Sequence, residues 1–164
     1  MKTFSHPGQD EQAPADLNEA LHATVTVARS QVKYVADVEV DLGDLPSVTC
    51  NVGELNQVFL NLIVNAAHAI EDTGERGVIK VRTSRSGDNA LVEISDTGVG
   101  ISEEMRLKIF EPFFTTKDVG RGTGQGLALA SAVVRDRHGG SIALDSTVGA
   151  GSTFTVSIPI EGSR

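Results

Sequence analysis

Apolar residues recur every three or four positions between residues 53 and 70, the spacing of a helix that buries one face. The apolar positions are Leu55, Val58, Phe59, Leu62, Ala66, Ala69 and Ile70. A second stripe of the segment is entirely polar, and its members are Glu54, Gln57, Asn61, Asn65 and His68. A polar stripe is normally a solvated face, but asparagine is a mediocre helix former. Two asparagines one turn apart, Asn61 and Asn65, therefore need another reason.

Weaker patterns predict the remaining elements. Asp16 is the expected cap of a helix over residues 17–32, and Gly139-Gly140 ends another over residues 127–138. A short helix is expected at 103–110, and strands at 38–42, 78–84, 90–95, 142–146 and 153–158. Strands and helices do not alternate regularly, so a doubly wound fold is excluded. The order predicts an α+β fold, a two-layer α/β sandwich with about three helices on one face of a mixed, mostly antiparallel sheet.

The length of 164 residues fits one domain. Residues 1–15 are polar with two prolines and are expected to form a linker or tail, residues 16–160 the domain, and residues 161–164 a second tail. The net charge of −8 argues against a nucleic-acid partner. The lone Cys50 and the lack of an apolar run of about 20 residues predict a cytoplasmic domain.

A glycine-bearing segment follows the strand that ends near Ser95. It reads Asp96-Thr97-Gly98-Val99-Gly100-Ile101. A carboxylate at a strand end can accept a hydrogen bond from an exocyclic amine such as N6 of adenine, and glycines let the backbone pass close to a flat ring. Taken alone, the same residues are better explained by an ordinary Asp-Thr-Gly turn.

Two further features suit a nucleotide. The run Gly122-Thr123-Gly124-Gln125-Gly126 leads directly into a predicted helix, where backbone N–H groups can hold phosphate. It is not a P-loop, because no Lys-Ser or Lys-Thr follows the last glycine. Asn61 and Asn65 project from one helix face, and neutral oxygens suit a magnesium ion shared with phosphates. An adenine acceptor, a phosphate cradle and a metal-binding helix together predict a Mg2+ and ATP site.

Four segments in order resemble the motifs of bacterial sensor histidine kinases. Residues 54–70 look like the asparagine box and residues 96–101 like the first glycine box. Phe110-Glu111-Pro112-Phe113-Phe114-Thr115-Thr116-Lys117 is similar to the phenylalanine box of nitrogen-regulation-type sensors, and residues 122–127 resemble the second glycine box. The hairpin at residues 149–159 also fits. The resemblance implies the ATP-binding fold shared with type II topoisomerases, mismatch-repair ATPases and certain chaperones.

By that resemblance Asn65 is the magnesium ligand and Asn61 assists at the triphosphate, while Asp96 reads adenine. Asn61 and Lys117 are the expected catalytic residues, although a solvated lysine is an equal alternative for Lys117. Residues 111–123 would be a mobile lid, anchored by Phe113 or Phe114. The full set expected at the nucleotide is Asn61, Asn65, Asp96, Gly98, Gly100, Ile101, Thr116, Lys117, Thr123, Gly124, Gln125, Gly126, Leu127 and Thr153.

Two residues depart from the family pattern. Gln125 stands where the family often has leucine, which we expect to tune the lid without abolishing binding. His68 stands where acidic or polar residues are common, and a solvated helix histidine is a simpler interpretation than a pH-sensitive site residue.

The resemblance also separates transfer from hydrolysis. Related ATP hydrolases carry a glutamate one turn before the metal asparagine, where this chain has Asn61, which cannot take up a proton. The phosphoacceptor histidine of the family is usually followed by Asp or Glu, but the four histidines here precede Pro7, Ala23, Ala69 and Gly139. We therefore expect a monomeric kinase domain with two partners, a separate dimerisation and phosphotransfer hairpin of the parent kinase and a response regulator. The sequence leaves open whether the parent kinase is membrane-attached. A nucleotide-binding regulatory module, an anti-sigma-type serine kinase and an ATPase clamp are the alternatives.

Overall fold

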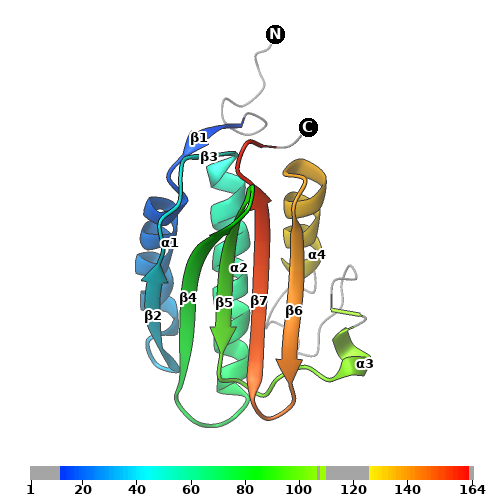
Figure 1. Cartoon of the computed structure of the whole chain (residues 1–164). Helices are drawn as coiled ribbons and strands as arrows, with labels where there is room; N and C mark the ends of the chain where they lie inside the picture. Colours follow the sequence, from blue (N-terminus) through cyan, green and yellow to red (C-terminus); the bar gives the residue numbers. More distant parts are fainter. Residues whose placement is uncertain (1–11, 107, 110–125, 163–164) are drawn as a thin grey trace, which may run out of the picture.

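The computed structural model describes residues 12–106, 108–109 and 126–162 as two packed layers (Figure 1). One layer is a five-stranded sheet in the order β2-β4-β5-β7-β6. Its strands are β2 (Ala36–Leu42), β4 (Gly77–Ser86), β5 (Asn89–Asp96), β6 (Ser141–Thr147) and β7 (Gly151–Pro159). Only β2 and β4 pair in parallel, and the other neighbours are antiparallel. The mixed, mostly antiparallel sheet expected from the sequence is confirmed.

The second layer consists of helices on one face of this sheet. Its members are α1 (Leu17–Val32), α2 (Val52–Glu71) and α4 (Gly126–Ala132), the last continuing as a π-helical turn over Val133–Arg137. Both long helices begin at side-chain caps, because Asp16 accepts a hydrogen bond from the Glu19 N–H and Asn51 from the Glu54 N–H. The fold class is therefore as predicted, with α2 between α1 and α4 (Figure 1).

Alternation along the strands places the core between the layers. In β5, Ala90, Val92 and Ile94 are buried, while the intervening Leu91 and Glu93 lie on the other face and are partly exposed. Leu55, Phe59 and Leu62 of α2 are fully buried. The apolar stripe that predicted this helix therefore faces the sheet and leaves the polar stripe outside.

A second sheet was not predicted. Strands β1 (Ala13–Ala15) and β3 (Val48–Cys50) pair antiparallel, with Ala13 opposite Cys50. The last residues of the stretch expected to be a linker or tail are thus paired with the strand that leads into α2. Strands of three residues are too short to show a period, so hydrophobic patterning does not predict them. The amide of Thr49 also donates to the carbonyl of Ile160, joining the C-terminal end to this small sheet.

Two predicted helices differ from the observed ones. The segment expected to be helical over 103–110 is α3 only at Glu103–Arg106, and residues 107 and 110 lie outside the described part. The helix expected over 127–138 changes from α to π geometry at Val133. It ends at Gly139, whose φ of 68° is the left-handed conformation of a C-terminal glycine cap.

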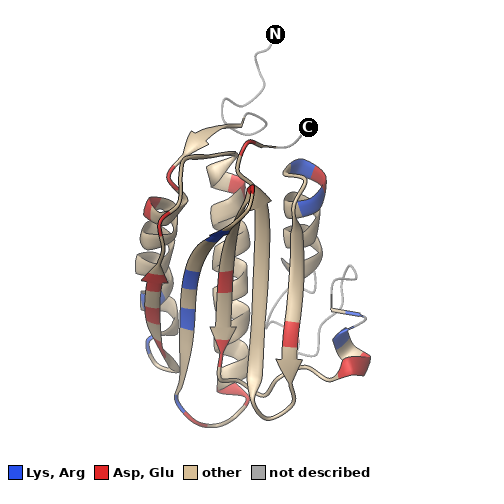
Figure 2. Ribbon diagram, in the orientation of Figure 1, with Lys and Arg blue, Asp and Glu red and all other residues tan. Residues whose placement is uncertain are grey.

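Charged residues of the sheet are concentrated on β2 and β4, whereas β7 has none (Figure 2). Glu39 and Asp41 of β2 are exposed opposite Lys80 and Arg82 of β4. Arg82 lies between two carboxylates, 3.6 Å from Asp41 and 3.7 Å from Glu93. Cross-strand pairs of opposite charge stabilise a sheet modestly. No helix within the described ranges is long and apolar enough to cross a membrane.

Candidate nucleotide-binding site

Asp96, the predicted adenine acceptor, is the last residue of β5 and is 8% exposed. It continues the buried series of β5, so its side chain belongs to the face that the helices cover. Its Oδ1 accepts a hydrogen bond of 2.8 Å from the Gly98 N–H. Burying a carboxylate is costly unless it is hydrogen-bonded, and this local turn supplies such a bond. A carboxylate is thus held at the sheet end beneath the helix layer.

The glycines after Asp96 are required by close backbone contacts. A β-carbon on Gly98 would lie 2.5 Å from that of Ala69 in α2, and the Val99 N–H donates to the Ala69 carbonyl at 3.1 Å. Gly100 has a φ of 79°, and a β-carbon there would lie 2.2 Å from the carbonyl oxygen of Thr147. The sequence interpretation attributed these glycines to a flat ring. In the structure they let the loop fit between α2 and the β6–β7 turn.

A serine pair fixes the end of this loop, and the sequence reasoning missed it. The Ile101 N–H donates to Ser146 Oγ at 2.7 Å, and that hydroxyl donates in turn to the Gly151 carbonyl at 3.1 Å. Ser146 Oγ also lies 2.8 Å from Ser152 Oγ. The two serines are directly opposite each other in the β6–β7 pairing. The available signal was the symmetric placement of two serines around the predicted hairpin turn.

Thr153 is not brought together with Asp96. The partner of Asp96 across β5 and β7 is Ser152, which is 5% exposed, while Thr153 is paired with Ser95. Thr153 Oγ1 lies 2.9 Å from Ser95 Oγ. Successive residues of a strand point to opposite faces, so Thr153 lies on the sheet face without helices. The hydroxyl on the same face as Asp96 belongs to Ser152.

Asn61 and Asn65 both lie on α2 and are partly exposed, outside its buried stripe. Ala69 follows Asn65 by one turn, a rise of about 6 Å. Because Ala69 contacts Gly98, the Asp96 loop and the asparagine face meet on the same half of α2. His68 is also partly buried.

The second glycine segment is described only at its end. Thr116, Lys117, Thr123, Gly124 and Gln125 lie outside the described residues, as does the expected lid with Phe113 and Phe114. Gly126 is the first residue of α4, so a helix begins where the sequence predicts the phosphate cradle to end. Leu127 is partly buried and packs against the core.

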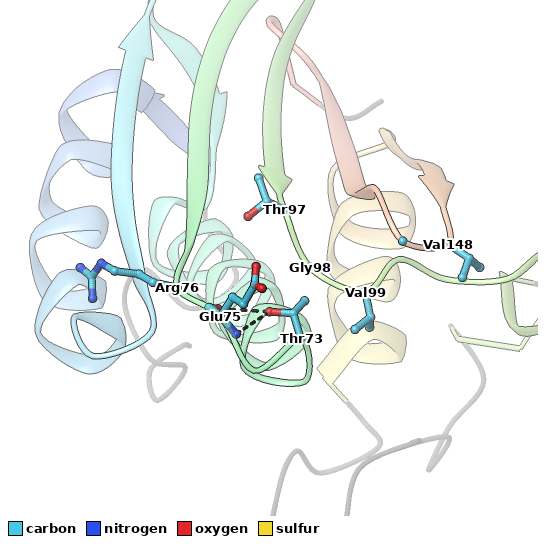
Figure 3. A pocket seen from close by; sticks show the side chains of 8 residues that line it. Thr73, Glu75, Arg76, Thr97, Gly98, Val99 and Val148 are labelled. Atoms are coloured by element: carbon cyan, nitrogen blue, oxygen red, sulfur yellow. Dashed lines mark hydrogen bonds between the residues drawn. The ribbon is translucent and has the colours of Figure 1, made fainter.

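A hollow of about 600 Å3 lies beside the loop after β5 (Figure 3). It is lined by Thr73, Glu75, Arg76, Thr97, Gly98, Val99, Val148 and Gly149. Asn61, Asn65 and Asp96 are not among these residues. The Thr97 hydroxyl already accepts the Val78 N–H, and the Thr73 hydroxyl donates to the Ile70 carbonyl. Among the predicted site residues that the structure describes, Gly98 alone borders this hollow.

Asp37, Arg76 and Cys50 have shifted pKa values, and none of the three is a predicted site residue. The guanidinium of Arg76, 2.6 Å away, lowers the pKa of Asp37 by a hydrogen bond and by its charge. Burial raises the pKa of the Cys50 thiol to about 11.

Most of this chain is similar in sequence to known proteins. Residues 50–162 match the family described as histidine kinase-, DNA gyrase B-, and HSP90-like ATPase. Sensor histidine kinase ZraS of Escherichia coli K12 is 42% identical over 120 residues, which is 73% of this chain and 24% of that protein. The histidine-protein kinase AtoS of the same strain is 33% identical over 163 residues, or 96% of this chain and 25% of that protein. The chain thus spans about a quarter of these relatives.

Solved structures match over nearly the whole chain. The catalytic domain of histidine kinase ThkA superposes with a TM-score of 0.81 at 31% identity, covering 92% of this chain and 97% of that one. Full-length ShkA in complex with AMPPNP superposes with a TM-score of 0.81 at 25% identity, covering 93% of this chain and 32% of ShkA. The chain therefore belongs to the histidine kinase-, DNA gyrase B-, and HSP90-like ATPase family, as a catalytic domain of the sensor histidine kinase type.

Proposed function

We propose that this chain binds Mg-ATP and presents its γ-phosphate to a histidine on the dimerisation hairpin of a parent kinase, in two-component signalling. The contact between Gly98 and Ala69 carries this proposal, because it joins the buried Asp96 carboxylate to the helix face of Asn61 and Asn65. ShkA, whose fold this chain shares, was crystallised with a nucleotide analogue. Adenine would then be recognised at Asp96, and the phosphates would be positioned at Asn61 and Asn65.

The roles of the residues follow from their chemistry. Asp96 would accept the N6 amino group of adenine, which an anionic oxygen does better than a neutral one. Ser152, at the same level of the sheet, is the hydroxyl that supports this end of the pocket. The loop 97–101 would wall the base, held by Ser146 and by the Ala69 carbonyl. We retain Thr116, Lys117, Thr123, Gly124 and Gln125 as proposed phosphate contacts from the sequence alone.

The asparagine face fits magnesium by its donor chemistry. Carboxamide oxygens are hard ligands of the kind Mg2+ prefers, and no cluster of His, Cys, Asp or Glu that could hold a metal exists within the described residues. Asn65 would therefore share the ion with nucleotide phosphates and water. When bound, Mg2+ supplies charge neutralisation for the transferred phosphate.

Asn61 favours transfer over hydrolysis. An amide cannot take a proton from water, so an external nucleophile is required. ThkA was crystallised in complex with a response regulator, TrrA. We propose by analogy that the parent of this chain passes its phosphate to a response regulator, and that the isolated domain is a cytoplasmic monomer.

The test is reconstitution in trans. The chain, labelled Mg-ATP and a separately made hairpin carrying the phosphoacceptor histidine should yield acid-labile, base-stable phosphate on the hairpin. Asn65→Ala should abolish transfer, and a hairpin with its histidine replaced should remain unlabelled. Label on serine of a partner protein would instead support the anti-sigma-type reading.

A further inference from the structure

His138 is a buried histidine that is not among the predicted nucleotide contacts. It is 1% exposed, and both ring nitrogens have partners. Nε2 lies 3.0 Å from the backbone nitrogen of Asn51, and Nδ1 lies 2.9 Å from the carbonyl oxygen of Val133. A backbone N–H can only donate, so Nε2 is the acceptor and Nδ1 carries the proton that bonds the carbonyl. The ring thus joins two segments 87 residues apart.

The first segment is the π-helical turn that follows α4. π-Helical turns are rare and often occur at functional positions. One extra residue in a helix rotates everything after it by about 100°. The ring of His138 bonds the carbonyl of Val133, the first residue of the turn Val133–Arg137. The π-helical turn therefore lies directly before His138, whose ring contacts the beginning of α2.

The second segment is the first turn of α2. Asn51 is its cap and is 4% exposed, with Oδ1 accepting the Glu54 N–H at 3.1 Å. Glu54 Oε2 in turn lies 2.5 Å from Nε of Arg137, the neighbour of His138. We call Asn51, Glu54, Arg137 and His138 the junction. It joins the end of one helix to the beginning of another by a hydrogen bond and an ion pair.

These two helices carry different parts of the proposed site. From the junction α2 leads to Asn61 and Asn65, and Asn65 lies about 21 Å further along the helix axis. From Gly126, where the glycine segment ends, α4 leads back to the junction. Sliding of α4 along α2 would break the His138 bond to Asn51, since a hydrogen bond weakens steeply with distance and angle.

We propose that His138 is a positioning residue, which fixes the register between the metal-asparagine helix and the phosphate-loop helix. This inference rests on the proposed nucleotide site. Packed apolar contacts between α2 and α4 are not directional, so they fix the position of one helix along the other less specifically than a hydrogen bond does. The ring of His138 supplies such a bond. His138 touches no nucleotide in this arrangement and acts through α2 and α4.

The test separates positioning from simple stabilisation. His138→Leu removes both bonds at similar volume, His138→Gln keeps an acceptor that reaches the Asn51 N–H, and His138→Asn is too short to reach it. Val25→Ala, or Leu21→Ala if it matches better, removes buried volume from α1, which lies on the other side of α2 from α4 (Figure 1). Of these two α1 variants, the control is the variant that lowers Tm by the same amount as His138→Leu.

Mg-ADP affinity is measured by calorimetry on the full chain. His138→Leu and His138→Asn should weaken binding about threefold to tenfold relative to the Tm-matched control, in the range of one lost hydrogen bond, and His138→Gln should stay within about twofold of the parent. Equal affinities in His138→Leu and the control would overturn the proposal. If His138→Leu does not fold, the comparison of His138→Gln with His138→Asn decides in the same way.

Amide hydrogen exchange without nucleotide keeps this inference distinct from the proposed function. Loss of the junction should accelerate exchange in the first turn of α2 and in α4 of His138→Leu, but not in the α1 control. Exchange that rises equally in both variants would overturn positioning even if ADP binds. Failure of the parent chain to bind Mg-ADP would instead refute the proposed function, while the exchange result still decides the role of His138.

Discussion

Gly98 lies so close to Ala69 that a β-carbon on the glycine would be 2.5 Å from that of the alanine. Within the same contact, the backbone carbonyl oxygen of Ala69 would be 2.8 Å from the added atom. The loop after Asp96, the proposed adenine acceptor, is thereby seated directly on α2, which carries the proposed metal ligand Asn65. The distance between the two functional groups is set by backbone approach, which only a residue without a side chain permits.

Gly98→Ala should therefore force the loop away from α2. We expect a loss of stability of about 1–3 kcal/mol from overpacking, with a loss of Mg-ADP affinity at temperatures where the variant is folded. Urea unfolding and calorimetry measure the two effects. Gly53→Ala is the matched control, because its β-carbon would meet only Asn51 Oδ1 at 3.6 Å, and the helical alanine should be neutral or stabilising by about 0.5 kcal/mol. Equal behaviour of the two variants would remove the close contact as the explanation.

The second prediction concerns adenine. Asp96→Asn retains an oxygen that can accept the Gly98 N–H but lacks the charge that strengthens a bond to the N6 amine. We expect ADP affinity to fall by about 1.5–3 kcal/mol, while the melting temperature changes less than in Asp96→Ala. Calorimetry with ADP provides the measurement. Unchanged affinity in a folded Asp96→Asn variant would take Asp96 out of the site.

The third prediction separates the two faces of the sheet at the β6–β7 hairpin. Ser146→Ala removes the acceptor of the Ile101 N–H and should cost about 1–3 kcal/mol of stability, with weaker nucleotide binding. Thr153→Val removes a hydroxyl on the opposite sheet face. The partner of this hydroxyl among the described residues is Ser95. Its Mg-ADP affinity should stay at the parent value. A large effect of Thr153→Val on binding would support the sequence interpretation of Thr153 instead.

Thr153 shows which structural features can be predicted from the sequence and which cannot. The hairpin was predicted, but a shift of one residue in a strand exchanges the two faces, so pairing decided between Ser152 and Thr153. Helix α2 was predicted within one residue at each end, because twenty residues contain several periods. Strands β1 and β3 contain too few residues for any period, and the π-helical turn depends on the contact of His138 with Asn51, which is distant in sequence.

The candidate site divides in the same way. Asp96 and the asparagines were identified from residue chemistry and motif order, which do not require coordinates. Ser146 and Ser152 act through a hydroxyl contact formed only when β6 and β7 pair. The contacts of Gly98 and Gly100 with α2 and the β6–β7 turn depend equally on tertiary packing. The groups proposed to touch a ligand can thus be named from the sequence, whereas the contacts that hold them become visible only in the structure.

The fourth prediction uses the single cysteine. Burial raises the pKa of Cys50 from 9.0 to about 11, and the thiolate is the reactive form. Iodoacetamide at pH 8 should alkylate the folded chain much more slowly than the chain unfolded in urea. Because the folded pKa is the higher one, the contribution of this thiol to stability is complete below about pH 9 and is lost as pH rises through about 11. Cys50→Ala should remove that alkaline loss, and its persistence in this variant would assign it to other groups.

The last prediction separates a kinase domain from a self-sufficient ATPase. Asn61 gives the asparagine face no carboxylate to activate water, and none of the four histidines has the following acidic residue of a phosphoacceptor. The chain alone should bind Mg-ATP yet release little phosphate and carry no acid-labile label. Asn61→Glu would supply a base one turn before Asn65, and a rise in ATP turnover would show that only this group was missing. If turnover does not rise, the turnover of the unmodified domain decides between kinase and ATPase. Asn65→Ala is the control for contaminating ATPases, since it removes the metal ligand and leaves the chain otherwise intact. Rapid ATP turnover by the parent, lost in Asn65→Ala, would refute the kinase assignment, because phosphate would then be reaching water without any histidine.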